Sequence, residues 1–145
     1  MKKIFLLFLI IITTQQSFSQ YTISYNHRYL LKDRKPFYWL GDTGWELFQR
    51  LTKEETDEYL KRRTAQDFTV TQAVVLAEMD GLHTPNAYGA KPLINDDPTK
   101  PNEAYFKFVY YVIDKSNDYN LNTAMLPIWG DKINKGTCGA LKFLM

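Results

Sequence analysis

The sequence has one cysteine, two histidines and no long hydrophobic run, and each shortage excludes a class of protein. A single thiol, Cys138, forms no internal disulfide, so packing alone must stabilise the fold. His83 has Asp80 and Glu78 nearby, but no second histidine at a ligand spacing, which argues against a metal site. No histidine is placed as a partner for a nucleophilic Cys138. We therefore expect neither a metal nor a cofactor.

The composition is that of an ordinary globular domain. Hydrophobic residues make up 45% and charged residues 23% of the 145 residues, which excludes a disordered chain. Aromatic residues are unusually frequent at 15%. Outside the first 19 residues, 16 basic side chains balance 16 acidic ones. This zero net charge gives no indication of a nucleic-acid partner.

The first 19 residues predict a cleaved signal peptide. Lys2 and Lys3 precede nine apolar residues (4–12), and Ser17 and Ser19 stand where a signal peptidase requires small side chains. Nine residues rise only about 14 Å as a helix, too little for a hydrocarbon core of about 30 Å. We expect export to the periplasm or the medium, without a membrane anchor in the mature protein.

The remaining chain alternates strand and helix patterns. A short β-hairpin is expected over 21–31, with a turn at 33–36 that leads into a first strand at 37–40. Thr52 and Glu55 form a capping-box pattern that starts a helix running to about residue 66. The later expected elements are a buried strand at 68–77, an irregular loop at 78–101, an amphipathic helix at 103–119 and a strand at 121–128.

Both helix-to-strand junctions carry a residue that tolerates the left-handed conformation, Asp67 and Asn120. Such repeated helix-then-strand units predict parallel strands in an α/β fold. An open doubly wound sheet and a closed (β/α)8 barrel both fit this pattern. The first strand lacks a Gly-rich turn, which disfavours the dinucleotide-binding version.

Carboxylates, indoles and amides gather after the predicted strands, where parallel α/β folds place their sites. Such groups suit a carbohydrate, because carboxylates bond sugar hydroxyls while aromatic rings pack on sugar C–H faces. Asp42 and Glu78 are also candidates for a glycosidase pair, which needs two carboxyl groups about 5 to 9.5 Å apart. The candidate residues for substrate binding are Asp42, Trp45, Glu78, Asp80, His83, Asn86, Trp129 and Asp131.

Four segments together resemble one family. They include Gly41-Asp42-Thr43-Gly44-Trp45, Ala77-Glu78-Met79-Asp80-Gly81, Thr84-Pro85-Asn86 and Trp129-Gly130-Asp131. The chain is similar here to the amino-terminal part of the apiosidase-like glycoside hydrolases, secreted bacterial enzymes common in gut Bacteroidetes. The resemblance implies a (β/α)8 barrel that removes terminal sugars, apiose from pectin being the characterised case. It also implies that the eight candidates line a sugar pocket.

Two departures from the family pattern matter. Asp67 and Asn120 replace the glycines that usually end the family's helices, a mild change. The family's catalytic carboxylates come from later strands without a counterpart here, so the resemblance places no catalytic residue in this chain and implies catalytic groups beyond residue 145. The Asp42/Glu78 pair loses support accordingly.

The last eight residues suggest a frameshift. The family continues with a segment like Trp-Gly-Pro-Glu-Ile-Phe, where this chain reads Cys138-Gly139-Ala140-Leu141-Lys142-Phe143-Leu144-Met145. One set of codons for these eight residues encodes Trp-Gly-Pro-Glu-Ile-Phe-Asn in another frame. We therefore expect a signal peptide (1–19), a partial barrel domain (20–137) and a frameshifted tail (138–145).

The sequence thus predicts the first three strands of a glycoside hydrolase barrel, preceded by a short β-hairpin and catalytically incomplete. The expected partner is a plant polysaccharide or oligosaccharide. A three-stranded parallel sheet exposes its edges and inner face, which predicts low solubility. The alternative is an exported carbohydrate-binding module that does not hydrolyse its ligand.

Overall fold

The computed structural model describes residues 20–130, and the chain divides into two compact units, residues 1–38 and 39–145. The expected signal peptide (1–19), Asp131 and the expected frameshifted tail (138–145) lie outside the described residues. Among residues 20–130, every helix is too short or too polar to cross a membrane. Each unit contains a sheet of its own.

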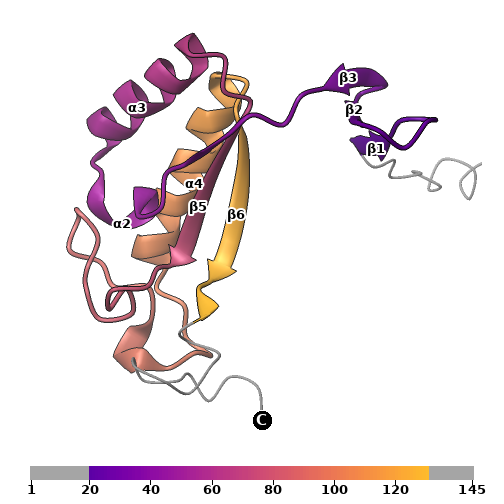
Figure 1. The fold of residues 1–145 in the computed structure, drawn as a ribbon. Helices are drawn as coiled ribbons and strands as arrows, with labels where there is room; N and C mark the ends of the chain where they lie inside the picture. The colour runs from indigo at the N-terminus through magenta and orange to yellow at the C-terminus, as the bar shows by residue number, and fades with distance from the viewer. Residues whose placement is uncertain (1–19, 131–145) are drawn as a thin grey trace, which may run out of the picture. The chain divides into compact units, whose positions relative to one another are not determined.

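The first unit holds a small antiparallel sheet rather than the simple hairpin that the sequence predicts. Its strands follow one another in the order β1-β2-β3 (Figure 1). The turn between the second and third strands places Asp33 and Arg34 at φ values of 51° and 65°. Two successive left-handed residues match the twist of tight hairpins. The strands are β1 (Tyr21–Ile23), β2 (Leu30–Lys32) and β3 (Lys35–Phe37).

The second unit is built on a parallel sheet with β5 in the middle, which confirms the predicted α/β class. Its order is β4-β5-β6, and both neighbouring pairs are parallel. The central strand is buried on both faces as predicted, with Val70, Ala73 and Val74 fully inaccessible. The strands are β4 (Gly41–Thr43), β5 (Val70–Leu76) and β6 (Asn122–Ile128).

The predicted first strand at 37–40 is wrong. Phe37 ends β3 of the antiparallel sheet, and the first parallel strand is Gly41–Thr43, which the sequence pattern places after the strand. Gly and Asp have low strand propensity, but pairing with a buried neighbour outweighs such a preference. Asp42 lies opposite Thr71 of β5. It is therefore part of a strand and does not follow one.

The two long helices begin where the sequence predicts, and a short helix, α2, precedes them without having been predicted. The Thr52 hydroxyl accepts from the N–H of Glu55 at 3.2 Å, and the Glu55 carboxylate accepts from the N–H of Thr52 at 2.8 Å, which completes the capping box. The Asn102 side chain caps the second long helix by accepting from the N–H of Ala104. The helices are α2 (Leu47–Arg50), α3 (Lys53–Ala65) and α4 (Glu103–Asp118), with a 3-10 turn η1 (Ile94–Asp96).

The core lies between the parallel sheet and its helices. Ala73 and Val75 of β5 pack against α2 and α4, and the Tyr105 hydroxyl donates to the carbonyl of Val75 at 2.7 Å. Burial raises the pKa of Tyr105. The buried side chains of α4 recur at spacings of three and four, which confirms the predicted apolar face: Tyr105, Phe108, Val109, Val112 and Ser116.

Both helix-to-strand junctions have the predicted conformation. Asp67 has a φ of 63° and Asn120 a φ of 57°, and each directly follows the C-cap residue of a helix. The two left-handed residues turn the chain from helix into the next parallel strand.

The segment from 78 to 101 is irregular as predicted, apart from η1 and a single bridge between Leu93 and Pro101.

The capping box supplies a test of α3. Thr52→Ala removes the acceptor for the Glu55 N–H and should lower the free energy of unfolding by about 1 kcal/mol. Glu55→Gln is the matched control, because Gln also completes a capping box and should cost much less. Urea denaturation followed by circular dichroism measures both. Equal losses in the two variants would contradict this account of the helix start.

Candidate functional site

Three of the predicted site residues meet at the carboxyl ends of the parallel strands. The indole Nε1 of Trp45 donates to Oε1 of Glu78 at 3.0 Å. The rings of Trp45 and Trp129 pack edge to face, with centroids 4.4 Å apart and an interplanar angle of 73°. All three side chains are half-buried. We call these three residues the indole–carboxylate cluster.

Each member of the cluster is held by a strand end. The carbonyl of Trp45 accepts from the N–H of Val74 at 3.2 Å, which ties the chain after β4 to β5. Buried Leu47 and Phe48 of α2 fix the following turn. Glu78 comes two residues after β5, and Trp129 directly follows β6. Because the strands are parallel, these ends lie at one edge of the sheet.

Asp80 and His83 lie on the loop that follows β5. The Nδ1 of His83 pairs with Asp80, and its Nε2 lies 3.8 Å from Oδ1 of Asp96. Asp80 and Asp96 adopt left-handed φ values of 67° and 55°. His83 therefore links the start of the loop to η1. The three side chains are about half exposed, so these pairs stabilise the loop only slightly.

Asn86 shapes the same loop from within. Its side chain is only 4% exposed, and its Oδ1 accepts from the N–H groups of Tyr88 and Ala90, each at 3.0 Å. The Tyr88 hydroxyl accepts from the N–H of Lys53 at the start of α3. The structure therefore shows a structural use for Asn86, and its predicted contact with substrate stays a prediction.

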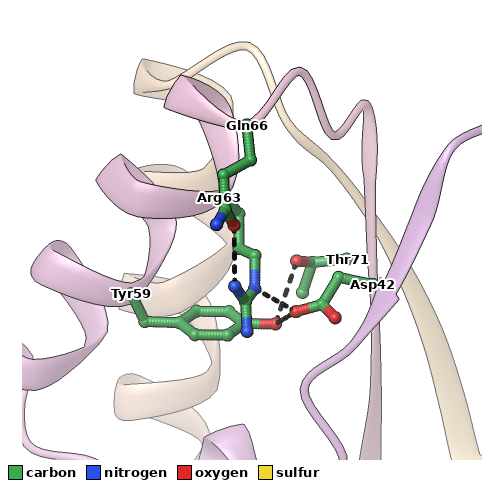
Figure 2. A network of polar contacts seen from close by, with 5 residues as sticks. All are labelled: Asp42, Tyr59, Arg63, Gln66 and Thr71. Atoms are coloured by element: carbon green, nitrogen blue, oxygen red, sulfur yellow. Dashed lines mark hydrogen bonds and ion pairs between the residues drawn. The ribbon is translucent and has the colours of Figure 1, made fainter.

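Asp42 lies apart from the cluster, in a polar network between β4, α3 and β5. Figure 2 shows its carboxylate directed at α3, where it accepts from the Tyr59 hydroxyl at 2.6 Å and pairs with Arg63. The Tyr59 hydroxyl also lies 3.5 Å from Oγ1 of Thr71, and Arg63 donates to Gln66. This network attaches the helix to two strands.

The geometry rules out Asp42 and Glu78 as a facing pair. Asp42 is level with Thr71, and β5 continues for five residues, about 16 Å, before it ends at Leu76. Glu78 follows that end and bonds Trp45, while Asp42 bonds α3. The pairing of these two carboxylates as glycosidase groups is therefore wrong, because the sequence places the end of the first strand before Asp42.

The network shifts the pKa values of its members. Partial burial raises the pKa of Asp42, but the hydrogen bonds from Tyr59 and Arg63 and the charge of Arg63 outweigh that effect and hold it below its ordinary value. Burial and the bond to Asp42 raise the pKa of Tyr59. The bond to Asp42 raises the pKa of Arg63. Asp42 is therefore an ionised structural anchor at neutral pH.

Sequence reasoning did not single out Tyr59, Arg63 or Asp96 for these contacts. Tyr59 and Arg63 are four residues apart on α3, a spacing that puts both on one helix face. That spacing indicates that the two side chains act together, but it does not reveal which strand residue they contact.

The last predicted site residue, Asp131, lies outside the described residues. Within residues 20–130, no three His, Cys, Asp or Glu side chains are grouped to hold a metal ion.

The fold is that of glycoside hydrolases. A glycoside hydrolase family 5 protein from Bacteroides vulgatus ATCC 8482 superposes with a TM-score of 0.69 and 27% identity, over 81% of this chain and 26% of that one. Another solved structure, described as a glycoside hydrolase, gives a TM-score of 0.70 and 27% identity, over 81% of this chain and 27% of that one. The chain therefore spans about a quarter of each structure's length.

The family model of the apiosidase-like catalytic domain matches residues 24–143 of this chain. The chain belongs to the apiosidase-like family, which confirms the resemblance seen in its motifs. No curated protein matches the chain. The match includes both the indole–carboxylate cluster and the Asp42 network.

The Asp42 network predicts a pH-dependent stability. Because the pKa of Asp42 is lowered on folding, its stabilisation is complete above its unfolded value of 3.8 and is lost as the pH falls through the folded value. Asp42→Asn should therefore cost about 1 to 2 kcal/mol at pH 7, a cost that shrinks below about pH 4. Urea denaturation of both proteins from pH 7 to pH 3 measures this.

Asp57→Asn is the matched control. The contacts of Asp57, an ion pair with Lys115 at 3.8 Å and a hydrogen bond from Tyr119, lie at the exposed surface, so this variant should lose less than about 0.5 kcal/mol. A cost of Asp42→Asn that stays constant down to pH 3 would contradict the charged anchor.

Proposed function

We propose that this chain forms the first three strands of a (β/α)8 barrel in an exported glycoside hydrolase that removes terminal sugars, of the apiose type, from plant polysaccharides. The observation that carries the proposal is the meeting of Trp45, Glu78 and Trp129 at the carboxyl ends of three parallel strands. Barrel enzymes build their sites at that end. Membership of the apiosidase-like family supports the reaction class.

The cluster suits a sugar for chemical reasons. A carboxylate accepts hydrogen bonds from hydroxyl groups, and indole surfaces contact the apolar C–H faces of a sugar ring. Glycoside hydrolysis needs a second carboxyl group about 5 to 9.5 Å from the first. Asp42 does not supply it, since it is bonded to α3. In this proposal the catalytic carboxylates come from strands beyond residue 145, and the present chain binds substrate.

A second candidate is an exported carbohydrate-binding module without hydrolysis. The separation of Asp42 from Glu78 favours it, because the cluster then offers binding groups without a facing carboxylate pair. Export in either case depends on the leader-like residues 1–19. The two candidates differ in whether sugar release appears once the remaining strands are supplied.

Binding without hydrolysis is the expected behaviour of this chain. An apiose-capped pectic oligosaccharide should bind in isothermal titration calorimetry, and chromatography should detect no released apiose. Trp129→Ala should weaken binding about tenfold, equivalent to about 1.4 kcal/mol, because the ring contacts are lost. Tyr25→Ala, which truncates a fully exposed aromatic residue in the other unit, is the control and should bind as the parent does.

The outcomes separate the candidates. Release of apiose by the chain alone would show that it is catalytically complete and overturn this proposal. No binding of the oligosaccharide would remove the carbohydrate role from both candidates. Addition of the later strands should restore hydrolysis if the chain belongs to an enzyme, and should leave binding alone if it is a module.

A further inference from the structure

We infer that Trp45 is a positioning residue for Glu78, not a platform for a sugar ring, and that Glu78 selects a neutral sugar through Oε2. This inference rests on the proposed function and deepens it. Both indoles of the cluster are candidates for sugar platforms from sequence alone. The contacts assign them different roles.

Both the N–H and the ring of the Trp45 indole already contact other residues of the protein. Its Nε1–H donates to Oε1 of Glu78 at 3.0 Å, and its ring packs edge to face on the Trp129 ring, with the ring centroids 4.4 Å apart. Its backbone carbonyl is bonded to β5 through Val74. A side chain held by two contacts on a backbone that is itself tied to β5 has little freedom to rearrange around a ligand. It is suited to hold another group in place.

The group it holds is the Glu78 carboxylate. A glutamate side chain at a strand end otherwise samples many rotamers, and ordering it on binding costs conformational entropy. The bond from Trp45 fixes Oε1 before the ligand arrives. No other hydrogen bond or ion pair joins Glu78 to a side chain among residues 20–130, so Oε2 keeps its acceptor capacity. A sugar hydroxyl donates to an acceptor of this kind.

The charge of this acceptor determines which sugars fit. No lysine or arginine within residues 20–130 forms an ion pair with Glu78, so its negative charge is not neutralised there. A uronic acid would bring a second carboxylate next to it, and two like charges in a half-buried site repel. A neutral terminal sugar brings only hydroxyl donors. The cluster therefore selects neutral sugars against acidic ones.

Besides its proposed ring contact with the sugar, Trp129 supports Trp45. It directly follows β6, while Trp45 follows β4 and Glu78 follows β5, so the cluster joins the ends of all three strands. Packing of Trp129 on the Trp45 ring sets the direction of the Nε1–H. The orientation of Glu78 thus depends on the pairing of all three strands.

A double-mutant cycle tests the positioning role. The variants are Trp45→Phe, which keeps a ring and removes the N–H, Glu78→Gln, and the two combined. Methyl apioside, an uncharged apiose derivative, is the neutral probe. We expect roughly tenfold weaker binding for Glu78→Gln and about fivefold for Trp45→Phe. The double variant should be no weaker than Glu78→Gln alone, because Trp45 acts only through Glu78. Trp39→Phe, an indole that precedes β4, is the control and should bind normally.

Two further measurements separate positioning from a merely structural role. The Trp45 indole N–H resonance in a ¹H–¹⁵N spectrum should move in Glu78→Gln even without sugar, while the remaining spectrum stays that of the folded chain. Digalacturonate is the acidic probe. The wild type should bind it more weakly than the neutral probe, and Glu78→Gln should reduce that preference.

The results that overturn the inference differ from those that overturn the proposed function. Losses that multiply in the double variant, or unchanged binding in Trp45→Phe, would show that Trp45 is an independent platform or has no role. A wild type that binds digalacturonate as well as the neutral probe would overturn the neutral-sugar selection. A wild type that binds neither probe would overturn the proposed function, and this inference with it.

Discussion

The parallel pairing of β5 with β4 and β6 is the constraint on which the rest of the second unit depends. β5 is buried on both faces, and its register with each neighbour fixes which residues are level. All three strands run the same way, as the parallel arrows of β5 and β6 in Figure 1 illustrate, so the residues that follow their carboxyl ends lie at one edge of the sheet. The indole–carboxylate cluster is a direct consequence of strand direction and register.

Two carboxylates illustrate how register determines a role. Asp42 lies within β4, level with Thr71, and its side chain points to the helices, where Tyr59 and Arg63 bind it. Glu78 lies beyond β5, where Trp45 is the one side-chain donor among residues 20–130 that binds its carboxylate. The Asp42 carboxylate holds α3 against the sheet through these bonds. In the proposed site, the Glu78 carboxylate keeps an oxygen for a ligand.

The sequence predicts much of the fold because the signals are local. The capping box at Thr52, the left-handed residues Asp67 and Asn120 and the period of the apolar side chains in α4 each depend on neighbours within a few residues. The first parallel strand escapes such reasoning. Gly41-Asp42-Thr43 has the composition of a turn, and only its partner Val70-Thr71-Gln72, almost thirty residues away, makes it a strand.

The same error explains why the sequence predicts the site only in part. Trp45, Glu78 and Trp129 follow strand ends in either interpretation, so their meeting is foreseeable. Asp42 changes from a site residue to an anchor once the strand moves by a few positions, because successive side chains point to opposite faces of a sheet. Which oxygen of Glu78 is bonded is a matter of side-chain contact that no spacing encodes.

The short first strand also explains why the residue at position 45 is a tryptophan. Thr43, the last residue of β4, is level with Gln72, whereas β5 continues for four more residues, about 13 Å. Trp45 leaves the sheet at the level of Val74, to which its carbonyl is bonded, yet its partner Glu78 lies past the end of β5. A long, rigid side chain with a donor near its far edge bridges that offset. Phenylalanine lacks the donor, and a lysine would supply a charge without the rigidity that fixes a carboxylate in one orientation.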